Sequence, residues 1–528
     1  MASVTRAQAT STEASSAVAV DDENSDSSST NFQSLRRKRR RTESKNNING
    51  DECNESDVKA FSGVNQYKGW VVPEANYRIP VLGDENDEDL KPRNFYEKYV
   101  RRRRPVVIRR SKLPEELEHL NKWMSSNEDI LQRAGDETIM VEKRSGEKDS
   151  FGKGNEVSLS FRDFLKLVQD ESDALHYLTT QDVEANQDGR PELMSPFMKR
   201  LHSGNSRNSG SDNGDGSSSS TFPLQPTITG NLVPQNINLW MGNSQDGASS
   251  GLHHDYHDNL YVVLRGTKKF RLYAPSDTHD MYTRGRLSRV HTNGRINYEG
   301  ELTTAYGADP ASYAAALAQT AKEEAEERLV AAEKAVEEGK PGAENELEEA
   351  EALLDEAMEA ILDAENDDED DEEDAFCLET AREEDVAGMV CDVDELSSSS
   401  DEVGDIDENI NDGLRRIVDK TVKNPNNFSK VDPSLLDDPK KLQKDFPKIL
   451  VAKAAFCECS CGDILYLPAS WFHEVTSISE SGTPSKTAKG HMAFNYWFHP
   501  PDAENDFENP YTTDFWPNDF KDRFKDTK

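Results

Sequence analysis

The chain has 528 residues, of which 34% are hydrophobic and 31% are charged, and its formal net charge is −39. The hydrophobic share is below that of an ordinary globular protein, so we expect a substantial part of the chain to lie outside any packed core. The acidity is concentrated in residues 321–410, which hold 37 Asp or Glu and 5 Lys or Arg. It is therefore a property of one segment and carries no information about an active site.

Composition also bears on the compartment. Six Cys in a chain of this length exclude a disulfide scaffold and fit a reducing environment. No apolar run reaches the length of a membrane span, and the N-terminus lacks the apolar stretch of a secretory signal. We expect a soluble intracellular protein, in the nucleus and/or the cytoplasm, with no membrane partner.

Residues 1–64 have the polar composition of a disordered tail. The tail contains the basic cluster Arg36–Arg41, which is typical of nuclear import signals and is also found as a solvated charge run. We expect no nucleic-acid partner. Residues 203–220, almost all Ser, Gly, Asn and Asp, are expected to form a flexible loop.

Ordered sequence begins near Tyr67. The patterns predict two helices, at 91–100 with Phe95, Tyr99 and Val100 facing inward and at 161–168 with Ser160 as N-cap. The arginines at 101–104 are expected to be exposed. Period-two alternation and buried-type apolar runs predict strands at 79–82, 105–108, 137–142, 157–160, 236–241, 260–264, 268–273, 452–457, 464–467, 475–478 and 491–498.

Two different compositions interrupt the strand-rich sequence. Residues 309–363 predict an antiparallel helical pair broken at Gly339–Gly342, and residues 364–412 are Asp-, Glu- and Ser-rich low-complexity sequence. We interpret 301–420 as an insertion into one β-rich domain, because loops tolerate insertions at small entropic cost. That domain spans 65–300 and 421–528, the latter including a C-terminal extension.

Three residues have the spacing of metal ligands. His253 and Asp255 form His-x-Asp, which puts both side chains on one face of an extended segment, and His473 follows a Gly-Asp turn and a strand. Two imidazoles and one carboxylate leave three positions open on a metal, as in non-haem Fe(II) oxygenases. His254 and His257 remain alternatives to His253 if the register slips.

The sequence blocks around these residues resemble the JmjC family of Fe(II)/2-oxoglutarate oxygenases, and most closely its small protein hydroxylases of the cupin-like group, which act on lysine or asparagine. The blocks that match, within about 76–300 and 424–500, are 238–240, 252–255, 259–261, 266–268, 275–277, 462–468, 471–473 and 495–497. The resemblance implies a mainly β (α+β) fold, the double-stranded β-helix or cupin jelly roll, carrying the helical and acidic insertion.

The resemblance also implies a cosubstrate site. Fe(II) would be held by His253, Asp255 and His473. Lys268 would supply the cation for the distal carboxylate of 2-oxoglutarate, since a buried Lys is costly without an anion. The remaining cosubstrate residues implied are Ser250, where the family usually has Thr, Tyr177, Asn259 and Asn495. Asn259 has an alternative role, in which it caps a turn before the strand. Lys269, next to Lys268 in the sequence, is expected to be solvated.

Other candidates have weaker patterns. Cys457, Cys459 and Cys461 alternate, but a zinc site normally has four ligands, so we expect ordinary thiols on a strand. His279, His291 and His491 have no ligand-like context. Trp471 and Trp497 are expected in the core.

The expected function is hydroxylation of a protein side chain with release of succinate and CO₂. Two alternatives remain. One is N-methyl-lysine demethylation by the same centre. The other is a non-catalytic scaffold whose acidic segment binds basic proteins. The oligomeric state is open, with a homodimer as one option.

Overall fold

The computed structural model describes residues 64–144, 146, 154–170, 175–185, 191–203, 220–301, 303–362, 425–479, 488–503 and 506–524. The chain divides into two compact units, Met1–Glu55 and Ser56–Lys528, and every described residue belongs to the second. The basic cluster and the acidic segment predicted from sequence lie outside the described residues, as does nearly all of the predicted loop at 203–220.

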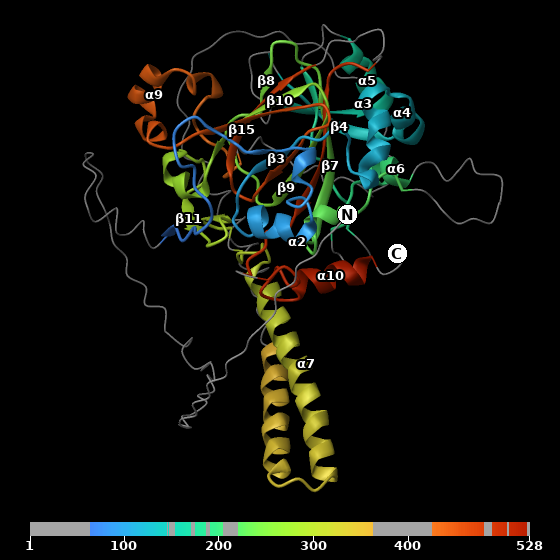
Figure 1. Ribbon diagram of the computed structural model, residues 1–528, viewed down its shortest axis with the longest axis vertical. Helices are drawn as coiled ribbons and strands as arrows, with labels where there is room; N and C mark the ends of the chain where they lie inside the picture. Colours follow the sequence, from blue (N-terminus) through green and yellow to red (C-terminus); the bar gives the residue numbers. More distant parts are fainter. Residues whose placement is uncertain are drawn as a thin grey trace, which may run out of the picture. The chain divides into compact units, whose positions relative to one another are not determined.

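Two sheets form the centre of this unit (Figure 1). The strand order of the larger is β2-β3-β14-β9-β16-β7-β6-β4-β5, and that of the smaller is β1-β13-β10-β15-β8. The larger sheet comprises β2 (Val81–Leu82), β3 (Val106–Ile108), β14 (Ile464–Leu467), β9 (Asp258–Arg265), β16 (His491–Phe498), β7 (Pro234–Gly242), β6 (His176–Leu178), β4 (Thr138–Lys143) and β5 (Asn155–Ser160). The smaller comprises β1 (Tyr77–Arg78), β13 (Ala455–Ser460), β10 (Thr267–Tyr273), β15 (Phe472–Ile478) and β8 (Ala248–Ser249), and β11 (Leu287–Val290) pairs with β12 (Ile296–Tyr298).

Strand β9 shows how the layers are built, because both of its faces are buried. Leu260, Val262 and Leu264 belong to the core shared with the helices, whereas Tyr261 and Val263 belong to the core between the sheets. Side chains alternate along a strand, so one continuous apolar run serves both layers. The predicted class, a β sandwich with helices, is confirmed.

Helices cover the outer face of the larger sheet (Figure 1). They are α2 (Pro92–Phe95) continued by the π-helix η3 (Tyr96–Val100), α3 (Asn121–Ser125), α4 (Glu128–Ala134), α5 (Phe161–Gln169) and α6 (Pro196–Ser203). The remaining elements are the 3₁₀ turns η2 (Asp84–Asn86), η4 (Glu115–Leu120), η6 (Thr227–Thr229), η7 (Pro275–Asp280), η8 (Pro433–Leu435) and η9 (Pro447–Leu450), and the helices α9 (Pro439–Asp445) and α10 (Phe515–Arg523). Ser160 caps α5 as predicted, with its Oγ accepting from the Asp163 amide at 3.1 Å.

The expectation that the arginines at 101–104 are exposed is wrong for Arg103. Arg103 is not exposed charge: its exposure is 3%, and its guanidinium forms a buried ion pair with Asp258, Nη1 donating to Oδ2 at 2.8 Å. The residue also has a φ of 55°, a left-handed conformation that is uncommon for a side chain of this size. The apolar pattern of the neighbouring strand contains no sign of this partner, which is 155 residues away.

The helical pair consists of α7 (Pro310–Glu337) and a second helix over 343–362. Six of its buried alanines recur every seven residues, at 318, 325 and 332 on one helix and at 343, 350 and 357 on the other, and Ala335 is also buried. A seven-residue repeat keeps one seam facing the partner helix, and small side chains allow the backbones to approach closely. No helix among the described residues is long and apolar enough to cross a membrane.

The parts of the chain that precede and follow the helical pair contact each other. Asn426 Nδ2 donates to Glu301 Oε1 at 2.5 Å, and residues 426–430 run beside residues 282–285 through backbone hydrogen bonds. The described residues that flank the helical pair therefore contact each other within the sandwich.

Candidate metal centre

The three candidate ligands come from two backbone segments that are hydrogen-bonded to each other. His253 and Asp255 lie in the loop between β8 and β9, and His473 is the second residue of β15. The backbones of His253 and His473 exchange two hydrogen bonds, of 3.0 and 2.7 Å, and the Ser470 amide donates to the Asp255 carbonyl at 2.7 Å. Positions 220 residues apart are thus fixed as neighbours by main-chain pairing.

Their ligand atoms converge. His253 Nε2 lies 3.9 Å from Asp255 Oδ1, and His473 Nε2 lies 3.7 Å from Asp255 Oδ2. Protein N and O atoms bind first-row metals at about 2.0–2.2 Å, so one ion can bridge ligand atoms up to roughly 4 Å apart. This is the single group of three or more His, Cys, Asp or Glu within the described ranges whose ligand atoms could hold a metal ion.

Backbone carbonyls orient both imidazoles. Nδ1 of His253 contacts the Gly251 carbonyl at 3.0 Å, and Nδ1 of His473 contacts the Trp471 carbonyl at 2.9 Å. Because a carbonyl only accepts, each Nδ1 carries the proton and each Nε2 keeps its lone pair for a metal. Burial, reinforced by His473, lowers the pKa of His253 to about 4, which keeps the ring neutral.

The neighbouring histidines face elsewhere. His254 is fully buried, and its Nε2 lies 2.8 Å from the Tyr298 hydroxyl. The His257 ring stacks on Trp497 with centroids 5.8 Å apart. On the other side, Phe428, which follows the insertion, stacks on the His253 ring at 4.7 Å. The geometry therefore brings His253, and neither His254 nor His257, together with Asp255 and His473.

A buried lysine lies deeper between the sheets. Lys268 has 0% exposure, whereas Lys269 is 53% exposed. The Lys268 ammonium donates to Ser477 Oγ at 2.7 Å, lies 3.4 Å from His491 Nδ1, and lies 5.6 Å from the centre of the Tyr177 ring. Within the described residues no carboxylate pairs with it, and burial lowers the pKa of Lys268 to about 7.

Two neighbours of Lys268 were missed by the sequence analysis. Ser477 was not singled out, and His491, for which the sequence indicates no ligand-like context, is not among the candidate metal ligands but contacts Lys268. Both lie four residues from a recognised position on the same strand, Ser477 from His473 and His491 from Asn495. Strand alternation puts such pairs on one face, so the signal was present in the sequence.

Ser250 is placed differently from the expectation that it would face a cosubstrate carboxylate. Its hydroxyl donates to the Gly251 carbonyl at 3.0 Å and accepts from the Val475 amide at 3.1 Å. Val475 pairs with Phe270, two residue pairs along the ladder from Lys268–Ser477 and two from Leu272–His473. Ser250 therefore lies at an intermediate level, and Ser477 is the hydroxyl that contacts Lys268.

The amides form a connected row. Asn495 Nδ2 donates to Asn259 Oδ1 at 3.1 Å, and Trp240 Nε1 donates to Asn495 Oδ1 at 2.8 Å. Asn259 lies within β9, so the alternative in which it caps a turn is wrong. Trp471 is buried as expected, whereas Trp497 is half-buried.

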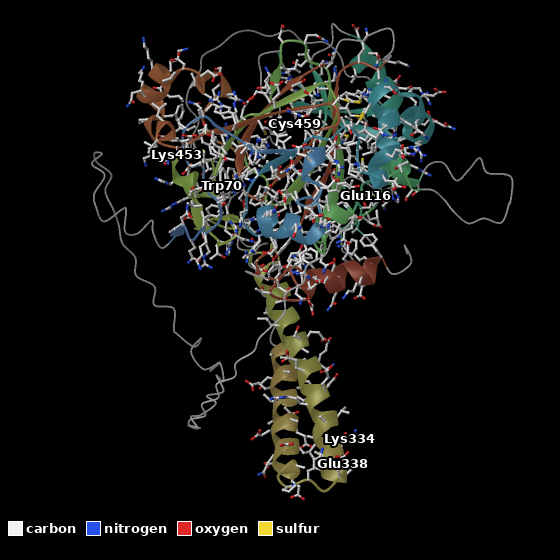
Figure 2. All side chains as sticks on the ribbon, in the orientation of Figure 1. Trp70, Glu116, Lys334, Glu338, Lys453 and Cys459 are labelled. Carbon is white, nitrogen blue, oxygen red and sulfur yellow. The ribbon has the colours of Figure 1, made fainter. Side chains whose placement is uncertain are left out.

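Two cysteines lie on β13, the neighbour of β10, and Cys459 is the register partner of Lys268. Cys457 and Cys459 are buried free thiols on β13, and Cys461 follows in the turn. Figure 2 labels Cys459.

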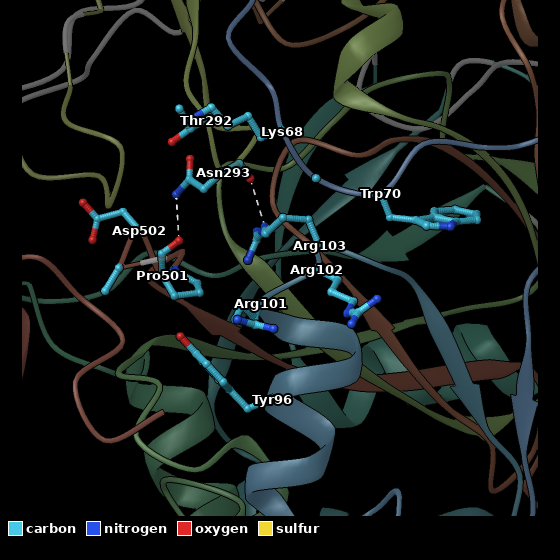
Figure 3. Close-up of a pocket in the computed structure, with 12 residues that line it drawn as sticks. Lys68, Trp70, Tyr96, Arg101, Arg102, Arg103, Thr292, Asn293, Pro501 and Asp502 are labelled. Atoms are coloured by element: carbon cyan, nitrogen blue, oxygen red, sulfur yellow. Dashed lines mark hydrogen bonds between the residues drawn. The ribbon is translucent and has the colours of Figure 1, made fainter. Parts of the chain in front are cut away.

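A separate cavity of about 450 Å³ lies beside Arg103 (Figure 3). None of the three candidate ligands lines it. The cavity wall at Arg103 is connected to the backbone segments that carry the candidate ligands. Asp258, the partner of Arg103, also accepts hydrogen bonds from the Tyr466 hydroxyl at 2.7 Å and from the Ala469 amide at 2.9 Å. Arg103 and Asp258 thus anchor the loop that carries Asp255 and the turn that precedes His473.

Comparison with known proteins accounts for this arrangement. A model of the cupin-like domain matches residues 92–504, most of the chain. The chain belongs to the cupin-like family. Over 477 residues, this cupin-like protein is 35% identical to the JmjC domain-containing protein 4 of Schizosaccharomyces pombe, covering 85% of this chain and 91% of that protein.

Shorter matches point the same way. The cupin-like protein is 41% identical over 49 residues to the lysine-specific demethylase JMJ32 of Arabidopsis thaliana, covering 9% of this chain and 14% of that protein. It is 49% identical over 45 residues to the JmjC domain-containing protein E of Dictyostelium discoideum, covering 8% and 12%. The predicted JmjC resemblance is confirmed, and the JmjC family includes Fe(II)/2-oxoglutarate oxygenases and demethylases.

Proposed function

We propose that this JmjC protein is an Fe(II)/2-oxoglutarate-dependent oxygenase that hydroxylates a protein side chain. The observation that carries the proposal is the convergence of two imidazoles and one carboxylate, above a buried lysine that has no acidic partner among the described residues. The first group suits a ferrous ion with open positions, and the second suits the anionic end of a diacid.

The ligand set fits Fe(II). His253, Asp255 and His473 would hold it through Nε2, a carboxylate oxygen and Nε2, with the tautomers already set by the Gly251 and Trp471 carbonyls. When bound with 2-oxoglutarate, Fe(II) supplies O₂ chemistry in which one oxygen atom ends in succinate, CO₂ is released, and the other oxygen enters a substrate C–H bond.

Lys268 would hold the distal carboxylate of 2-oxoglutarate. It lies four residues along β10 from Leu272, which pairs with His473. At about 3.3 Å per residue these positions are roughly 13 Å apart, a distance that an extended lysine side chain and a five-carbon diacid span together. Phe270 and Val475 lie between the two levels and would exclude water from the cosubstrate.

The other predicted cosubstrate residues would have supporting roles around the bound cosubstrate. The Asn259–Asn495 pair would lie near the metal-bound end of the cosubstrate, and Tyr177 would border its carboxylate next to Lys268. Ser250 would border the middle of the cosubstrate, since its level is that of Phe270 and Val475.

A second candidate function is N-methyl-lysine demethylation, favoured by the short match to a lysine-specific demethylase. Hydroxylation of an N-methyl group gives an unstable product that releases formaldehyde, so the same centre serves both reactions. The product therefore separates the two candidates: stable addition of one oxygen atom to a protein, or formaldehyde.

The test starts with purified full-length protein, Fe(II) and labelled 2-oxoglutarate, in the presence of an extract that supplies substrate. Succinate should form with the wild-type protein and fall to background in Asp255→Ala, while proteins in the extract gain one oxygen atom. Succinate formation that is equal in wild type and Asp255→Ala refutes the proposal, and formaldehyde release without oxygen gain selects the demethylase.

A further inference from the structure

We propose that His491 is the positioning residue of the cosubstrate pocket: it holds the Lys268 ammonium in place and closes the pocket floor, so that the pocket selects the length of the diacid. This inference rests on the proposed function and goes beyond it, because it concerns a histidine that no motif marks.

The position of His491 follows from strand register. It is the first residue of β16 and pairs with Gly242 at the end of β7, which in turn pairs with Tyr177. On the facing sheet the Lys268–Ser477 pair lies at the corresponding level, two residue pairs from Phe270–Val475. His491 is 0% exposed. It therefore lies at the end of the space between the sheets opposite to the three candidate ligands.

Two glycines make room for this ring. A Cβ on Gly242 would lie 3.1 Å from His491 Cε1 and 2.8 Å from Tyr177 Cδ2. A Cβ on Gly266 would lie 3.0 Å from His491 Cβ and 2.3 Å from a backbone oxygen, and Gly266 has a φ of 71°. The backbone at Gly242 thus lies against the imidazole, and the backbone at Gly266 lies against the Cβ of His491, which limits the room in which the ring can turn away from Lys268.

The hydrogen-bond donors of Lys268 and His491 outnumber the acceptors that the described residues place around them. The Lys268 ammonium has three donors, and Ser477 Oγ and His491 Nδ1 are its two acceptors. Because Nδ1 faces a donor, the His491 proton is on Nε2, and that atom is buried without a partner among the described residues. One N–H of Lys268 and one of His491 therefore lack an acceptor. A carboxylate brings acceptor oxygens and no donor, so it is the complementary group.

The same arrangement limits length. A diacid bound at the level of His473 would reach down toward Lys268, and we infer that the buried His491 ring next to Lys268 occupies the volume just beyond. A diacid one carbon longer would have to displace Lys268 or His491. Removing the ring should free that volume, whereas replacing it by an apolar ring of similar size should not.

The test uses full-length, Mn(II)-loaded protein under nitrogen, so that binding is measured without turnover. Calorimetry gives the Kd of 2-oxoglutarate and of 2-oxoadipate, which is one carbon longer, for wild type and for three variants of His491. His491→Ala opens the floor, His491→Phe keeps the volume without nitrogens, and His491→Gln keeps a donor and an acceptor. His279→Ala, a histidine 42% exposed beside Asp280, is the matched control.

We expect His491→Ala and His491→Phe to weaken 2-oxoglutarate binding about tenfold, the effect of a lost hydrogen-bond network near 1.4 kcal/mol. Only His491→Ala should reduce the preference for 2-oxoglutarate over 2-oxoadipate, by about tenfold, and His491→Gln should restore affinity to within about threefold of wild type. At saturating cosubstrate, kcat should change little while KM rises.

Three results overturn the inference while leaving the proposed function intact: unchanged Kd in both His491→Ala and His491→Phe, unchanged length preference in His491→Ala, or equal effects of His279→Ala. A wild-type protein that binds neither diacid contradicts the proposed function itself.

Discussion

Replacing Lys268 by methionine should stabilise the cosubstrate-free protein and should weaken the binding of 2-oxoglutarate. These two effects have opposite signs. Burial lowers the pKa of Lys268 from 10.5 to about 7. A shift of about 3.5 units at 1.36 kcal/mol each makes the charged form cost on the order of 5 kcal/mol relative to the unfolded chain. The lost hydrogen bond to Ser477 offsets about 1 kcal/mol of this. We expect Lys268→Met to raise the free energy of unfolding at pH 7 by roughly 2–4 kcal/mol.

The sign depends on pH. The folded protein binds fewer protons than the unfolded chain between pH of about 7 and 10.5, so wild-type stability rises with pH through that window. The penalty is fully present below about pH 7, and the advantage of Lys268→Met should shrink as the pH approaches 10. Urea unfolding of the metal-free protein at several pH values measures this directly.

Cosubstrate binding should change in the other direction. Truncating one member of a buried, hydrogen-bonded charge pair costs about 2–5 kcal/mol, which raises the Kd of 2-oxoglutarate about 30-fold or more. Lys269→Met is the matched control, because Lys269 is 53% exposed and its Nζ lies 4.0 Å from Glu458. It should change neither quantity by more than about 0.5 kcal/mol. A Lys268→Met protein that is less stable without cosubstrate and binds 2-oxoglutarate normally would refute this reasoning.

Three further predictions follow from the contacts described above. Asp258→Asn should lower the free energy of unfolding by about 3–5 kcal/mol, because it leaves the buried Arg103 charge unpaired; a loss below about 1 kcal/mol in urea unfolding contradicts this. The Kd of 2-oxoglutarate should rise as the pH increases above about 7, by up to tenfold per unit, because neutral Lys268 does not attract a carboxylate; Lys268→Arg should flatten that profile, and an unchanged slope argues against Lys268 as the anion partner. Replacing residues 310–420 by a short Gly/Ser linker should keep succinate formation within about twofold, since Glu301 and Asn426 already meet; a loss above tenfold would show that the insertion takes part in catalysis, and a lost basic partner would support the scaffold alternative.

Local patterns were sufficient for part of the site. The ligand atoms of His253 and Asp255, two residues apart, converge as predicted from their spacing, although both residues lie in a loop. Strand alternation does separate Lys268 from Lys269 on β10. Strand-like segments that resume after a segment of different composition predicted one β-rich domain, and the resemblance to the JmjC family implied its jelly-roll fold.

The rest depended on which distant strands pair, and in what register. Lys268 contacts Ser477 and His491 across 209 and 223 residues, and Arg103 contacts Asp258 across 155. A period of two gives the face of each residue but not its partner strand, so a register one pair different would put another side chain beside Lys268. The buried Arg103 was mistaken for exposed charge for this reason.

The central claim is tested most directly by metal binding. Titration of metal-free protein with Fe(II) under nitrogen should give one ion per chain in wild type. Binding should be lost in His253→Ala, Asp255→Ala and His473→Ala. It should persist in His257→Ala, whose ring stacks on Trp497. Stoichiometric binding that survives the loss of His473, or that requires His257, would contradict the account.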